Sequence, residues 1–153
     1  MPVAPRITLL TRLALPPETV FALWTRPDHV RHWWGGTMGR VISIQMDPKP
    51  RGMFWIAVTR EDGGGFDSYG SYVEVIRGEV LVIDWEHAGG KAVSRVVVQL
   101  LKLGDETEIT LTHRDFPDEG RRDLQQRRWE DALAALHIYA ATLDADGQPR
   151  PKP

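Results

Sequence analysis

Hydrophobic and polar positions change pattern along the chain, beginning with a strand and two short helices. Residues 6–13 alternate loosely and predict a strand. Apolar residues at helical spacing between Pro17 and Pro27 predict one short helix, because proline is tolerated in a first turn and interrupts a helix later. Residues 28–34 predict a second short helix, which the two glycines that follow can end. The pattern therefore begins with a strand and a pair of short helices.

A run of strands follows, rich in Val, Ile, Trp and Tyr and divided by clusters of Gly, Pro and Asp. Six strands are predicted, over residues 40–46, 53–60, 67–77, 80–87, 93–103 and 106–114. Their short turns favour antiparallel pairing of neighbours, because a tight turn can join only antiparallel strands. Together with the strand at residues 6–13, the sequence predicts seven strands.

The last element is a long amphipathic helix predicted over residues 118–143. Trp129, Leu133, Leu136 and Ala140 recur at helical spacing and predict its buried face. The opposite face is charged, and we interpret the basic strip at Arg121–Arg122 and Arg127–Arg128 as a solvated surface. Asp118 is the predicted N-cap.

This order of elements predicts an α+β fold of the helix-grip kind. A curved antiparallel sheet of about seven strands would wrap around the long C-terminal helix. Space between the sheet and the helix can remain as an elongated apolar cavity suited to a small molecule. We expect one domain over residues 1–147 and a flexible tail over 148–153.

Composition narrows the function classes. The 153 residues are 42% hydrophobic and 26% charged with a formal charge of −2, which fits a globular protein without a basic footprint for nucleic acid. The chain has no cysteine, which excludes disulfides, thiol catalysis and Cys-ligated metals. We expect no membrane span, since no apolar run approaches about 18 residues. The N-terminus lacks the pattern of a secretion signal, so we expect a cytoplasmic protein.

Short motifs in a fixed order resemble a known superfamily. In chain order they are VFALWTRP at 20–27, WWG at 33–35, DPKPRGMF at 47–54, GSYVEV at 70–75, TLTH at 110–113 and the pair Trp129 and Leu133. The first two are similar to the VFxAWTxPxxxxxWWG signature of the SRPBCC, or START-like, superfamily. The branch is the one related to the C-terminal domain of activators of Hsp90 ATPase. The resemblance spans residues 6–143 and implies the same helix-grip fold.

The sequence departs from that pattern at several positions. Arg51 stands at the first glycine of a glycine pair, Asp115 replaces a glycine before Phe116, Gly36 stands where proline is common, and Arg128 replaces a glycine before Trp129. A positive φ at position 51 would cost roughly 1 kcal/mol more for arginine than for glycine. The departures affect local turns and the pocket rather than the fold.

His113 is the candidate polar contact, because strand alternation places it on the face that meets the helix. Either it contacts a ligand or a neighbouring protein group satisfies its ring nitrogens. A Ser-His-Asp site would need Ser43, Ser68, Ser71 or Ser94 beside it, and none of these lies in a G-x-S-x-G motif. We assign no catalytic residue.

Aromatic side chains are the candidate apolar walls. The sequence has six tryptophans, of which Trp24 and Trp129 suit plain core packing, while Trp34 and Trp85 are better ligand candidates. The predicted ligand-binding residues are Trp34, Tyr72, Trp85, His113, Phe116 and Trp129. His29 and His32 share the spacing of metal ligands but lack a clear third ligand, so no metal site and no cofactor are predicted.

The sequence leaves three functions open. The first is binding of a small apolar, aromatic or lipid-like ligand in an internal hydrophobic cavity, which we expect rather than catalysis. The second, implied by the resemblance, is a chaperone-associated or stress-response interaction domain. The third is an enzyme resembling the polyketide cyclases, which would require an inward acid-base pair. Formation of a homodimer is also open.

Overall fold

The computed structural model describes residues 5–86 and 93–151 and shows a strand, two short helices, six strands and a long helix. The elements are β1 (Arg6–Leu13), α1 (Pro17–Thr25), α2 (Pro27–Val30), β2 (Gly39–Met46), β3 (Met53–Arg60), β4 (Gly65–Ile76), β5 (Val80–Glu86), β6 (Val93–Leu103), β7 (Glu106–Arg114) and α3 (Glu119–Ala140). The predicted order is confirmed.

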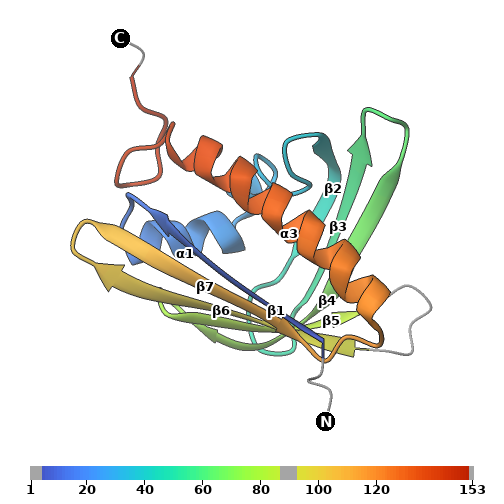
Figure 1. Cartoon of the computed structure of the whole chain (residues 1–153). Coiled ribbons are helices and arrows are strands. Elements are labelled where there is room, and N and C mark those ends of the chain that lie inside the picture. The colour runs from blue at the N-terminus through green and yellow to red at the C-terminus, as the bar shows by residue number, and fades with distance from the viewer. Residues whose placement is uncertain (1–4, 87–92, 152–153) are drawn as a thin grey trace.

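All seven strands form one antiparallel sheet in the order β1-β7-β6-β5-β4-β3-β2. Consecutive strands from β2 to β7 are neighbours, and β1 pairs with β7 from Arg6–Arg114 to Leu13–Thr107. The sheet curves around α3, which crosses its concave side, while α1 lies near one end (Figure 1). This is the predicted helix-grip fold.

Element boundaries differ from the sequence prediction by a few residues. The second short helix covers only Pro27–Val30, and turns replace helix over 31–35. Residue 87, predicted as the end of a strand, lies outside the described residues. The N-cap prediction is confirmed, because Asp118 accepts a hydrogen bond at 2.8 Å from the backbone N–H of Arg121. Within the described residues, no helix is long and apolar enough to cross a membrane.

Among the described residues, two that are not glycine have positive φ, and both depart from the superfamily pattern. Arg51 has φ of 71° and Asp115 has φ of 66°. Gly52 follows Arg51 in a turn so tight that a Cβ there would lie 1.8 Å from the carbonyl oxygen of Asp47. The turn therefore keeps its second glycine and stores strain at its first position.

Residues 148–150 fold back onto the segment that follows α3. The backbone N–H of Arg150 donates to the carbonyl of Thr142 at 2.8 Å, and Leu143 forms an isolated bridge with Pro149. Leu143 itself is buried. Residues 148–150, predicted as part of a flexible tail, therefore contact the preceding segment. The predicted domain boundary at residue 147 remains a prediction.

Candidate functional site

His113 lies at the centre of the core with both ring nitrogens hydrogen-bonded. Strand alternation on β7 buries it completely, as the sequence predicted. The indole N–H of Trp129 donates to Nδ1 at 3.0 Å. A neutral imidazole carries one N–H, so the proton is on Nε2 and is donated to Ser94 Oγ at 2.6 Å. Any ligand contact at His113 would have to replace one of these protein partners.

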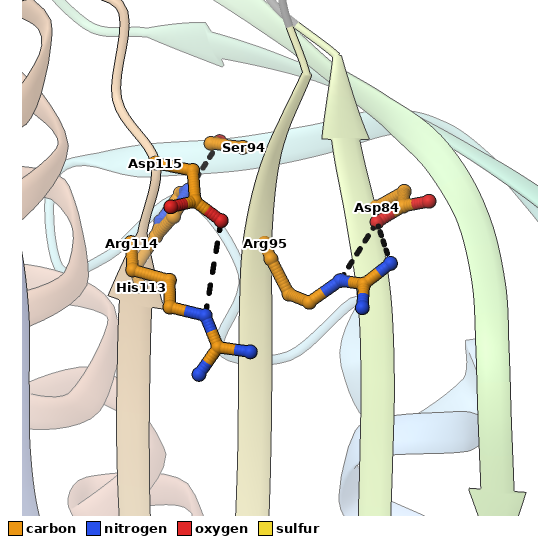
Figure 2. A network of polar contacts seen from close by, with 6 residues as sticks. All are labelled: Asp84, Ser94, Arg95, His113, Arg114 and Asp115. Carbon is orange, nitrogen blue, oxygen red and sulfur yellow. Dashed lines mark hydrogen bonds and ion pairs between the residues drawn. The ribbon is translucent and has the colours of Figure 1, made fainter.

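Of the four serines considered for a catalytic triad, the structure brings Ser94 beside His113. The third group that a triad requires is not a carboxylate here. A triad needs a carboxylate that accepts from Nδ1–H, whereas here Nδ1 accepts from Trp129. Figure 2 shows the nearby carboxylates paired with arginines. Asp84 accepts from the Arg95 guanidinium at 2.9 and 3.0 Å, and Asp115 lies 3.8 Å from that of Arg114. The network is suited to holding β5, β6 and β7 in register.

The other predicted ligand-binding residues gather around His113. The rings of Phe116, Trp85 and Trp129 have centroids 4.2, 5.6 and 6.3 Å from the imidazole. Trp34 packs on Trp85 at 5.9 Å. We call the set the aromatic cluster: Trp34, Phe54, Tyr72, Trp85, Phe116 and Trp129. Burial, with the charge of Asp47 adding to it, raises the pKa of Tyr72, so its hydroxyl stays protonated at neutral pH.

The aromatic cluster lies in the core, where the sequence predicted an internal cavity. One hollow beside α3 is about 10 Å³ and is lined by residues that include Trp34 and Trp129. A hollow of that size holds about one water molecule. That hollow is too small for a ligand, and the predicted internal cavity remains a prediction.

A much larger hollow lies at the edge of the sheet, beside the first half of α3. It is a groove of about 950 Å³. Pairing between β4 and β5 begins at Gly70 and Trp85, so within the described residues positions 65–69 of β4 have a strand neighbour only on the β3 side. We call this hollow the edge groove. Its lining includes Phe66, Trp85, Leu124, Gln125 and Arg128, and also the stacked pair Trp55 and Tyr69.

Of the predicted ligand-binding residues, Trp85 lines the edge groove, and Trp34 and Trp129 line the small hollow next to it. Tyr72, His113 and Phe116 line neither of these two hollows and are buried in the core. Their roles as ligand contacts remain predictions.

Arg128 is the principal charged group of the edge groove on the helix side. Its guanidinium carbon lies 3.9 Å from the centroid of the Phe66 ring, a cation-π contact. Burial, together with the nearby charge of Arg60, lowers the pKa of Arg128. The groove thus combines an apolar wall with a partly desolvated positive charge.

Sequence reasoning missed Arg128, Gln125 and Phe66 because it interpreted the basic strip as a solvated face. Helical spacing carried the signal, since Arg128 lies three residues after Gln125 and four before Ala132, and both of these neighbours are buried. Phe66 gave a weaker signal, because it lies at the end of a glycine-rich turn.

The two histidines considered as metal ligands meet Tyr139 of α3 instead. Nδ1 of His29 lies 2.7 Å from the Tyr139 hydroxyl, and the ring of His32 stacks on Tyr139 at 4.7 Å. Burial, with the charges of Arg26 and His32 adding to it, lowers the pKa of His29. Among the described residues, no group of three or more His, Asp or Glu side chains could hold a metal ion.

Comparison with solved structures supports the fold. The chain is similar to a protein from Rhodobacter sphaeroides (TM-score 0.79, 19% identity, covering 93% of this chain and 95% of that one). It is also similar to a protein from Chromobacterium violaceum (TM-score 0.77, 19% identity, covering 88% of this chain and 95% of that one). A third similar structure is the AHSA1 protein from Silicibacter pomeroyi (TM-score 0.76, 20% identity, covering 89% of this chain and 97% of that one). At these identities the likeness extends to the fold alone.

Sequence comparison identifies the family. No curated protein sequence matches this chain. The family model described as "Activator of Hsp90 ATPase homolog 1-like protein" matches residues 14–141, most of the chain. The expectation from the short motifs is therefore confirmed: the chain belongs to the activator of Hsp90 ATPase homolog 1-like family.

Proposed function

We propose that this protein binds a small aromatic or lipid-like molecule in the edge groove. The observation that supports this most is the volume of about 950 Å³, which lies within the range of about 300 to 1,000 Å³ typical of ligand pockets. Phe66, Trp85 and Leu124 supply apolar surface, and Gln125 and Arg128 supply polar groups. A few polar groups in an apolar groove are how such sites orient a ligand.

The edge groove is a better site than the interior for a physical reason. A ligand in the small hollow lined by Trp34 and Trp129 would have to displace rings of the aromatic cluster, whereas the edge groove is already open. Trp85 belongs to both, so a bound ring can contact the cluster without disturbing its packing.

The test is native mass spectrometry of the purified protein, followed by a thermal-shift screen with aromatic, flavonoid-like and lipid-like compounds. Selective binding to the folded state raises the melting temperature as ligand concentration rises. Leu124→Trp should fill part of the groove and reduce the shift, since Leu124 is exposed and lines it. Leu101→Trp, at an exposed leucine of β6 outside the groove, is the matched control. Equal loss in both variants, or no shift with any compound, would refute the proposal.

A second candidate function is interaction with a chaperone, favoured by the family name and by one surface feature. Met53 on β3 and Val73 on β4 are 64% and 41% exposed, and neither lines the edge groove. Clustered apolar residues on a surface favour protein contacts. Met53→Glu should weaken binding of purified Hsp90 in a titration while Leu124→Trp leaves it unchanged. Absence of binding by the unmodified protein would exclude this function for that chaperone.

A further inference from the structure

The guanidinium of Arg128 is held in a way that leaves its hydrogen-bond donors available. Its central carbon lies over the Phe66 ring, 3.9 Å from the ring centroid. A guanidinium carries five N–H donors around its edge, more than a contact with one ring face can use. Arg128 is half-buried in α3, and its side chain lines both the edge groove and the small hollow beside it.

Within the part of the chain that the structure describes, no carboxylate forms an ion pair with Arg128. Asp131, one turn further along α3, is the nearest acid on the same helix face. Its Oδ1 accepts from the Thr37 hydroxyl at 2.8 Å and its Oδ2 lies 3.8 Å from the Arg60 guanidinium. The carboxylate of Asp131 therefore contacts Thr37 in the loop after α2 and Arg60 on β3, and it forms no ion pair with Arg128.

The acidic residues of the groove lining belong to the other side of the sheet. Asp67 alternates with Phe66 and Ser68 along β4, and Glu86 follows the buried Trp85 on β5. Alternation places both carboxylates on the face opposite to the side chains that meet α3. Arg121, the other cation of the lining, lies 3.7 Å from its N-cap partner Asp118. The helix side of the groove thus carries positive charge beside an apolar wall.

We propose that the ligand of the edge groove is an aromatic acid, whose anionic group binds the Arg128 guanidinium while its rings lie against Trp85 and Leu124. The inference rests on the proposed function and adds the chemical class of the ligand. An anion in the plane of the guanidinium receives charge-assisted hydrogen bonds, which are the stronger kind. The Gln125 amide, in the same lining, can donate a further bond. Burial and the charge of Arg60 disfavour the charged form of Arg128, and a bound anion would offset that cost.

The test uses two fluorescent probes with the same ring skeleton. One is 8-anilinonaphthalene-1-sulfonate, an anion, and the other is N-phenyl-1-naphthylamine, which lacks the sulfonate and is neutral. Each is titrated into the folded protein and into Arg128→Gln. We expect the variant to bind the anionic probe about tenfold more weakly and the neutral probe within about twofold, because one charge-assisted hydrogen-bonded contact is lost.

Two variants control for net charge and for folding. Arg77→Gln removes the same charge at the β4–β5 turn, where the side chain is 78% exposed and lies at the other end of β4 from the groove. It should leave both affinities unchanged. Arg128→Lys keeps the charge but not the planar set of donors, so its preference for the anionic probe should lie between those of the unmodified protein and Arg128→Gln. Melting temperatures of all variants verify that the fold is intact.

The outcomes separate this inference from the proposed function. Equal weakening of both probes by Arg128→Gln, or equal weakening of the anionic probe by Arg77→Gln, overturns the aromatic acid and leaves groove binding standing. Binding of neither probe to the unmodified protein overturns both. A selective loss of the anionic probe in Arg128→Gln alone supports both.

Discussion

The hydrogen bond from Trp129 to His113 should contribute to stability, and a matched pair of substitutions can isolate its contribution. Trp129→Phe removes the indole N–H that Nδ1 of His113 accepts at 3.0 Å. Trp24→Phe makes the same chemical change in the same core, and the two tryptophans are 2% and 5% exposed. The indole nitrogen of Trp24 has no hydrogen-bond partner among the described residues. The two variants therefore differ in whether a buried acceptor loses its donor.

The expected difference follows from that acceptor. Each substitution loses ring atoms from the core at a cost of roughly 1 to 2 kcal/mol, and this part is shared. Trp129→Phe also leaves Nδ1 of a fully buried imidazole without a donor, which costs about 1 to 3 kcal/mol. Trp24→Phe leaves no acceptor unpaired. We expect the free energy of unfolding to fall by about 1 to 3 kcal/mol more in Trp129→Phe than in Trp24→Phe.

The assay is urea unfolding followed by far-UV circular dichroism, because tryptophan fluorescence would itself change. Equal dependence on urea concentration in the two variants shows that their unfolded states are comparable. The ¹⁵N spectrum of His113 provides an independent readout and should show the Nε2–H tautomer. Equal costs for the two variants, or an Nδ1–H tautomer in the unmodified protein, would refute the reasoning.

Two further predictions concern the turn before β3 and the histidine after α1. Arg51→Gly should raise the free energy of unfolding by about 1 kcal/mol, and the melting temperature by about 2 to 4 °C, because φ at this position is 71°; a lower melting temperature would contradict the strain argument. The folded-state pKa of His29 lies below its ordinary value of 6.5, so the unfolded chain binds the extra proton first and stability should fall as pH drops below about 6.5. His29→Gln should flatten that fall in a series of melting curves between pH 7.5 and pH 5; an unchanged slope would assign the fall to other groups.

The fold was predictable because each element carries its own periodic signal. Alternation along β5 and β7 placed Trp85 and His113 on the inner face, and both are buried there. Helical spacing placed Trp129 on the face of α3 that meets the sheet. The helix predicted over residues 28–34 was too long, because residues 31–34 form turns. Turns can bury an apolar residue such as Trp33 as well as a helix can, so burial alone did not identify the element.

The hydrogen-bond partner of His113 was not predictable, because it depends on strand register. The size of the interior hollow was not predictable either, because it depends on side-chain volume. Ser94 meets His113 through the pairing of β6 with β7, in which Val96 lies opposite His113. No motif around the serine encodes that register. Whether a helix-grip interior is hollow depends on the summed volume of its rings, which the alternation of apolar and polar residues does not give; the hollow lined by Trp34 and Trp129 is about 10 Å³.

The wall between the edge groove and the interior determines how deep a ligand can reach. Trp85 lines the groove and packs on Trp34 at 5.9 Å, and Trp34 in turn lines the small hollow beneath α3. Trp34 is half-buried, whereas Trp85 is 4% exposed, and Trp34 is followed by Gly35 and Gly36 with φ of 92° and 84°. Because that hollow holds about one water molecule, we expect a ligand that enters it to displace the ring of Trp34, whereas a ligand in the groove leaves the Trp34–Trp85 contact intact. Arg128 lines both the edge groove and the small hollow, so an anion bound to it is compatible with a ligand in either place. The position of the Trp34 ring, unchanged or displaced, distinguishes the two binding modes.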